Sequence, residues 1–89
     1  MSMYKLKTSK EFDKFLDKHR DWSPKIIAKL ELIAQNPFNT TLDIAKLQGQ
    51  ENHYRLRVGK YRVLYEIRDG EILIIYAYKA DSRGGIHKG

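Results

Sequence analysis

Apolar and polar residues follow helical spacing in the first half of the chain and strand alternation in the second. Residues 4–7 alternate apolar and basic side chains, which predicts a short, half-buried strand at a sheet edge. Between residues 9 and 20 the apolar positions recur every three or four residues and predict an amphipathic helix. A second helix is predicted to begin at Ser23-Pro24, because serine caps helices and proline suits their first turn, and to end at Asn36-Pro37.

The second half predicts three strands joined by tight turns. Residues 53–58 alternate, with apolar side chains at the even positions and Arg55 and Arg57 on the opposite face. A Gly-Lys turn leads into a strand at residues 61–68, and an Asp-Gly turn leads into the last strand at residues 71–78. The isoleucine-rich centre of that last strand predicts a central strand covered on both faces.

The segment between the second helix and these strands shows neither spacing. Residues 38–52 are therefore predicted to be irregular, with Leu42, Ile44 and Leu47 as apolar anchors and Gly49 in a turn.

These elements predict a β-α-α-β-β-β order within one α+β domain spanning residues 1–89. We expect the helix hairpin to pack on one face of a small, mostly antiparallel sheet. The opposite face and the polar, basic tail at residues 79–89 then remain open to a ligand.

Composition narrows the functional classes. The chain of 89 residues contains no cysteine, which excludes disulfides and cysteine-based zinc or redox sites. It shows neither a membrane-length apolar run nor an opening signal peptide, so a cytoplasmic location is expected. The net charge of +6 favours an anionic partner such as nucleic acid or an acidic protein.

The arginines are concentrated in the second half, where five of the six lie. Arg55 and Arg57 share one side of a strand, about 7 Å apart. Arg62 follows the hairpin turn, and Arg83 follows the last strand. Because guanidinium groups bind phosphate through a planar fork, this set is predicted to bind a phosphodiester.

A structural interpretation of the same arginines stays open at this point. Arginines on exposed strands keep a sheet soluble, and these have Glu51, Glu66 and Asp81 as possible ion-pair partners.

The three histidines differ in their surroundings. His87 lies in the tail four residues after Arg83 and is a candidate for proton transfer near neutral pH. His19 continues the apolar stripe of the first helix, and His53 begins a strand that borders the arginines. Their spacing gives no metal-binding motif.

Six tyrosines offer rings on which unpaired RNA bases could stack. Tyr61, Tyr65 and Tyr76 are expected in the core, whereas the pattern assigns Tyr54 and Tyr78 neither to the core nor to the surface.

A characteristic pattern, RxRVGxYRxxYEI, occupies residues 55–67. Leu47-Gln48-Gly49 precedes it, and further motifs lie at residues 4–12 and in the tail, where residues 83–88 are Arg-Gly-Gly-Ile-His-Lys. In the family that shares these motifs, the usual ending is Arg-Gly-Asp-x-Tyr-Lys. Together these stretches resemble the RelE/ParE toxin superfamily of bacterial and archaeal toxin–antitoxin systems over nearly the whole chain.

The resemblance implies a RelE-like toxin that enters the ribosomal A site and cuts the bound mRNA without a metal or another cofactor. The ribose 2′-hydroxyl attacks the adjacent phosphate, the 5′-oxygen leaves, and basic side chains neutralise the transition state. By motif, Arg55, Arg62 and Arg83 correspond to residues that bind and stabilise the phosphate. Arg57 forms a basic pair with Arg55 and is expected to orient the phosphate or to stabilise the transition state.

The tail departs from the family pattern, since His87 replaces the usual tyrosine and the aspartate is missing. A tail histidine transfers protons in the related YoeB-like toxins, so His87 is the predicted general acid or base. Asp43, Glu51 and His53 are candidates for a second proton-transfer group. Further contacts to RNA or the ribosome are assigned to Lys60, Lys79, Lys88 and His53.

The superfamily also contains members whose function differs from mRNA cleavage. ParE-like members share the fold but inhibit DNA gyrase, and a degenerate member would only bind its antitoxin. The partner implied in every case is a cognate antitoxin whose amphipathic, often acidic segment covers the helix hairpin and the sheet edge.

Overall fold

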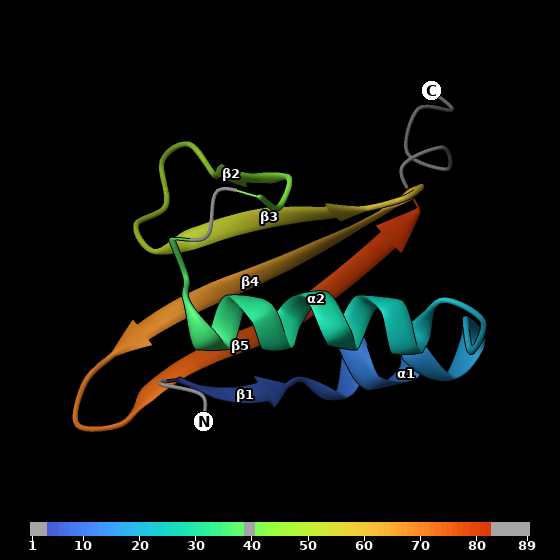
Figure 1. Cartoon of the computed structure of the whole chain (residues 1–89), viewed down its shortest axis with the longest axis horizontal. Coiled ribbons are helices and arrows are strands. Elements are labelled where there is room, and N and C mark those ends of the chain that lie inside the picture. The colour runs from blue at the N-terminus through green and yellow to red at the C-terminus, as the bar shows by residue number, and fades with distance from the viewer. Residues whose placement is uncertain (1–3, 39–40, 83–89) are drawn as a thin grey trace.

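The computed structural model describes residues 4–38 and 41–82. Two helices and five strands form in that part of the chain (Figure 1). In chain order they are β1 (Lys5–Thr8), α1 (Lys10–Lys18), α2 (Ser23–Gln35), β2 (Ile44–Lys46), β3 (His53–Val58), β4 (Tyr61–Asp69) and β5 (Leu73–Ser82).

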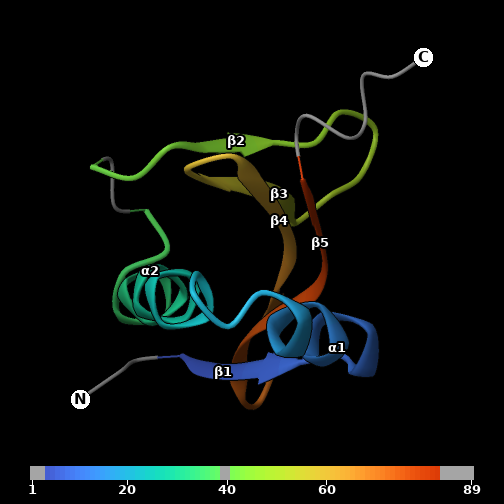
Figure 2. The ribbon, with the colours of Figure 1, turned by 90° about the vertical axis from the view of Figure 1, so that its right-hand side faces the viewer.

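The strands form one sheet in the order β1-β5-β4-β3-β2. β1 runs parallel to β5, and all other neighbours are antiparallel. Figure 2 shows the sheet curving around α2, with β1 and β2 at opposite edges. The predicted α+β fold, with a helix hairpin on a mostly antiparallel sheet and the first strand at its edge, is confirmed.

The structure adds a strand that the sequence did not predict. β2 has only three residues and lies in the segment expected to be irregular. It pairs with β3 so that Ile44 faces Leu56 and Lys46 faces Tyr54. Three residues are too few to show alternation, and the pairing depends on a strand that follows later in the chain.

The first helix begins as predicted, whereas the start of the second helix differs from the prediction. Ser9 caps α1 as expected, because its hydroxyl accepts a hydrogen bond from the Phe12 N–H at 3.0 Å. In α2, however, Trp22 occupies the cap position and Ser23 is already helical. The backbone N–H groups of Trp22 and Ser23 both donate to the carbonyl of His19, so the turn that closes α1 leads directly into α2.

The core lies between the helices and one face of the sheet. From the helices it takes Phe12, Ile26, Leu30 and Ile33, and from the sheet Leu56, Val63, Tyr65, Ile75 and Ala77, all fully buried. Apolar burial of this kind is the main favourable term in folding.

The expectation that the last strand is covered on both faces was wrong. Ile75 and Ala77 point toward the helices, so Tyr76 lies on the opposite face and is not a core residue as predicted. Ile72, placed within the strand by the sequence pattern, precedes β5 and is 56% exposed. An unbroken apolar run hides the period of two that separates the faces.

The β3–β4 turn is fixed against the helix hairpin. Gly59 has a φ of +60°, and a Cβ at this position would overlap the Trp22 ring. That ring also meets Tyr61 edge-on with centroids 5.3 Å apart. The turn that joins the two arginine-bearing strands is therefore held by packing.

No helix in the described part of the chain has both the length and the apolar character needed to cross a membrane.

Candidate functional site on the open face of the sheet

Three of the predicted site arginines lie on the face of the sheet that the helices leave open. Arg57 on β3 and Arg62 on β4 are cross-strand partners beside the turn, and Arg55 pairs with Leu64 two residue pairs further along. Cross-strand partners share a face, as do residues two apart on one strand. The structure thus brings Arg55, Arg57 and Arg62 together, which we call the arginine cluster.

Asp43 stands beside the arginine cluster at the start of β2. Its Oδ1 lies 3.8 Å from Nη2 of Arg55, and its Oδ2 lies 3.6 Å from Nη1 of Arg57. The Asp43 backbone is held in place, because its carbonyl accepts a 2.9 Å hydrogen bond from the Arg57 N–H. One carboxylate therefore faces two guanidinium groups, in the arrangement that a phosphate would take.

Arg55 and Arg57 each retain a donor that no described residue accepts. Nη1 of Arg55 and Nε of Arg57 are buried and have no hydrogen-bond partner among the described residues. A buried guanidinium N–H without an acceptor is costly. An anion at this position would supply the missing acceptors.

Arg62 carries its own carboxylate partner. Its Nε donates to Oδ1 of Asp81 at 3.3 Å, and both side chains are about one-third exposed. This pair is one of those expected if the arginines serve solubility. A partly exposed ion pair contributes only about 0–1 kcal/mol, so it leaves Arg62 able to exchange Asp81 for a stronger anion.

His53 lies next to the arginine cluster, two residues before Arg55 on the same strand. Its Nδ1 is 2.9 Å from the hydroxyl of Tyr78, and its Nε2 is 3.8 Å from Oε2 of Glu66. Burial raises the pKa of Tyr78, and the Glu66 carboxylate raises it further. The Tyr78 hydroxyl therefore stays protonated and fixes the His53 ring.

The remaining predicted residues fall into two groups. Lys60 and Lys79 are exposed, with Lys60 in the β3–β4 turn and Lys79 opposite Leu64 on the open face. Arg83, His87 and Lys88 lie outside the described residues. The last described residue, Ser82, pairs with Tyr61 beside the same turn.

Within the described ranges, no group of three or more His, Asp or Glu side chains is placed to hold a metal ion.

Sequence reasoning missed the position of Asp43, and it placed Tyr76 in the core. Asp43 was considered only for proton transfer, because its contact with Arg55 and Arg57 follows from the β2–β3 register. Tyr76 precedes the buried Ala77, so strand alternation places it on the open face. The sequence pattern began the last strand at residue 71, whereas β5 begins at Leu73 after a longer turn.

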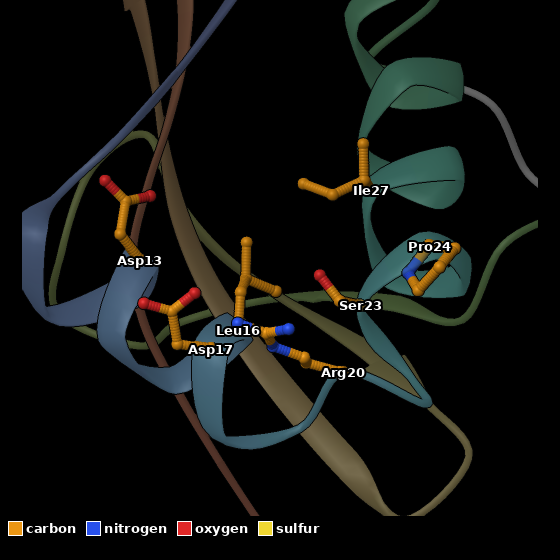
Figure 3. Close-up of a pocket in the computed structure, with 7 residues that line it drawn as sticks. All are labelled: Asp13, Leu16, Asp17, Arg20, Ser23, Pro24 and Ile27. Atoms are coloured by element: carbon orange, nitrogen blue, oxygen red, sulfur yellow. The ribbon is translucent and has the colours of Figure 1, made fainter.

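A hollow also lies on the helix side, away from the arginine cluster. It runs between α1 and α2 and is lined by Asp13, Leu16, Asp17, Arg20, Ser23, Pro24 and Ile27. Figure 3 shows Leu16 and Ile27 reaching into it from the two helices. Its apolar floor and mixed charges suit a protein segment better than a phosphate.

Residues 6–77 match the family model described as the ParE toxin of the type II toxin–antitoxin system parDE. The chain belongs to the RelE/ParE superfamily of type II toxins. The match covers both helices, β2, β3 and β4 with the arginine cluster, most of β1 and the first half of β5. It confirms the resemblance that the sequence pattern indicated.

Two solved RelE structures share the fold of this superfamily member. In the archaeal RelE–RelB complex from Pyrococcus horikoshii OT3, the similar chain is 26% identical, with a TM-score of 0.76, covering 92% of this chain and 97% of that one. In the RelB–RelE antitoxin–toxin complex from Methanococcus jannaschii, the similar chain is 32% identical, with a TM-score of 0.62, and the likeness covers 91% of this chain and 94% of that one. Comparison with curated proteins finds no significant match.

Proposed function

We propose that this toxin is a ribosome-dependent mRNA endoribonuclease that inhibits translation. The observation that carries the proposal is the arginine cluster, with buried guanidinium donors that have no acceptor among the described residues. The likeness to two RelE chains supports it.

The arginine cluster suits cleavage by an internal nucleophile. The 2′-hydroxyl of one ribose loses its proton and attacks the adjacent phosphorus, and the 5′-oxygen of the next nucleotide leaves with a proton. The products are a 2′,3′-cyclic phosphate and a 5′-hydroxyl. Arg55 and Arg62 bind the phosphate and stabilise the charge that builds on it, together with Arg83, while Arg57 orients it.

Proton transfer needs a different side chain, because arginine stays protonated in proteins. We assign the general acid or base to His87 in the tail. Lys60, Lys79 and His53, with Lys88, would contact the RNA or the ribosome around the cut phosphate. Neither a metal nor another cofactor takes part in this scheme.

A cognate antitoxin is the proposed protein partner. Both similar RelE chains come from complexes with RelB. We propose that the antitoxin of this chain places an amphipathic, acidic segment over the helix hairpin and the sheet edge. The hollow between α1 and α2 offers an apolar floor with Leu16 and Ile27.

The second candidate function is inhibition of DNA gyrase, and the family model that matches the chain favours it, because that model describes ParE toxins. Two assays on the same protein separate the candidates. An mRNA endoribonuclease would stop translation of a defined mRNA and leave gyrase supercoiling unchanged. A gyrase inhibitor would show the reverse, and a toxin that only binds its antitoxin would affect neither.

A further inference from the structure

Beside the arginine cluster, the open face carries a second set of side chains, and this set is mostly aromatic. It consists of His53 on β3, Arg68 on β4, and Tyr76 and Tyr78 on β5, which we call the aromatic patch. The helices cover the opposite face of the sheet, so the core does not account for these rings.

Tyr76 and Tyr78 face the same way because they lie two residues apart on β5, on either side of the buried Ala77. Tyr65 pairs with Ala77 and Leu64 pairs with Lys79, so Tyr78 is the extra residue in a register shift. Such a bulge turns a side chain out of the regular alternation. It brings Lys79 onto the same face as Tyr78, and the Tyr76 and Tyr78 rings have centroids 6.2 Å apart and planes inclined by 31°.

Neighbouring groups hold the rings of the aromatic patch in position. The guanidinium carbon of Arg68 lies 4.3 Å from the centroid of the Tyr76 ring, and its Nε donates to Glu66 at 2.9 Å. The His53 ring meets Tyr78 edge-on at 5.5 Å and shares a hydrogen bond with its hydroxyl. These planes are preorganised, so a ligand that stacks on them loses little additional side-chain entropy.

The aromatic patch adjoins the arginine cluster along β3. His53 and Arg55 are two residues apart on the same face, which separates them by about 7 Å. A single RNA strand that places a phosphate at Arg55 therefore brings a neighbouring base over the patch. Aromatic rings and arginine planes are the surfaces on which proteins stack unpaired bases.

We propose that the aromatic patch is a stacking subsite for a nucleobase of the single-stranded RNA whose phosphate the arginine cluster binds. This inference rests on the proposed function, since it takes RNA as the ligand. Every base has a flat face, so the subsite would add affinity with little preference for base identity.

The test compares two oligonucleotides that have the same phosphates. Both are 2′-O-methylated, which removes the attacking hydroxyl, and one lacks its internal bases. Binding of each to the full chain is measured by fluorescence anisotropy. We expect the base-bearing strand to bind at least about fivefold more tightly, since stacking of one base has about that effect.

Variants then locate the effect. Tyr76→Leu should remove most of the preference for the base-bearing strand, whereas Phe38→Leu should retain it, because Phe38 is an exposed ring in the segment after α2. Circular dichroism checks that both variants fold. The comparison of the two strands on the unaltered protein does not depend on either variant.

Two results would overturn the inference in different ways. Equal binding of both strands, weakened by Arg55→Gln, would rule out the stacking subsite and leave RNA binding by the arginine cluster intact. Absence of binding to either strand would overturn phosphate binding by the arginine cluster of the free protein and the subsite with it, whereas the translation assay tests the ribosome-dependent function separately. A preference for bases that survives Tyr76→Leu would place the stacking surface elsewhere.

Discussion

At the scale of single residues, the site is defined by arginines whose charges are only loosely compensated. Asp43 reaches Arg55 and Arg57 through contacts of 3.6–3.8 Å, longer than a hydrogen bond, and its side chain is 52% exposed. Pairs of this kind are screened by water and salt. If the arginine cluster binds an RNA phosphate as proposed, Asp43 is a weak internal competitor for that phosphate.

Replacing Asp43 with asparagine should strengthen RNA binding. The change removes one negative charge from the arginine cluster, which corresponds to about 0.2–1 kcal/mol for a partly exposed pair, or roughly a 1.5- to 5-fold lower Kd. The measurement is anisotropy with an uncleavable RNA strand, with Asp17→Asn on α1 as the matched control. Unchanged or weaker binding by Asp43→Asn would contradict the competitor role.

Tyr65 makes stability depend on alkaline pH. Burial, with a smaller contribution from Tyr54, raises the pKa of its hydroxyl well above the usual range. Below about pH 10 both the folded and unfolded states hold this proton; above it the unfolded state releases the proton first, so stability falls as pH rises. The free energy of unfolding should drop by about 1.4 kcal/mol one pH unit above the unfolded pKa.

Tyr65→Phe should remove that part of the alkaline loss. The hydroxyl has no hydrogen-bond partner among the described residues, so its removal should be neutral or slightly stabilising at pH 7. Urea unfolding at pH 7, 9 and 11 measures both effects, with Tyr54→Phe as the control for loss of a hydroxyl. A parallel pH profile for Tyr65→Phe and the unaltered protein would refute this role.

At the scale of elements, the β3–β4 hairpin links the core to the site. Its two strands bury Leu56, Val63 and Tyr65 on the helix side and present the arginine cluster on the other. Packing of the turn against Trp22 therefore also sets the distance between Arg57 and Arg62.

Gly59→Ala should destabilise the hairpin by about 1–3 kcal/mol. The added methyl group meets the Trp22 ring, and the positive φ is unfavourable for alanine. Gly70→Ala is the matched control, because a Cβ there has nothing within 4 Å. Equal midpoints of denaturant unfolding for the two variants would show that the turn is not fixed by this contact.

How far the sequence could predict these elements depends on the length of each pattern. Both helices, β1, β3 and β4 have enough periodicity to be located, and the arginines on β3 and β4 follow from strand alternation. β5 is located by its apolar run, which hides the difference between its two faces. β2 is too short to show a period, and the contact between Asp43 and Arg55 depends on its register with β3. The Tyr78 bulge depends on strand pairing, which single-strand alternation does not contain.

At the scale of the whole molecule, the arginine cluster and the hydrophobic core lie on opposite faces of the sheet. The core holds the helix hairpin on one face of the sheet, while the arginine cluster and the aromatic patch share the other. The net charge of +6 attracts any anion. Among the described residues, the buried guanidinium donors without a partner lie on the open face.

RNA binding should therefore weaken with salt in proportion to the number of phosphate contacts. With three contacts from the arginine cluster, the logarithm of the binding constant should fall with that of the salt concentration with a slope of about −2. Arg62→Gln should make the slope shallower by roughly 0.7, whereas Arg20→Gln, on the helix side, should leave it unchanged. A slope near zero would mean that phosphates are not bound.

We propose above all that the arginine cluster supports cleavage of mRNA on the ribosome. The most direct test translates a defined mRNA in vitro with the purified protein and maps cut sites by primer extension. We expect cuts that appear only when ribosomes are present. Arg55→Gln and Arg62→Gln should each reduce cutting by at least about tenfold, whereas Arg20→Gln should leave it unchanged. Translation that proceeds without cuts, or cuts that persist at full rate in Arg55→Gln and Arg62→Gln, would contradict the claim.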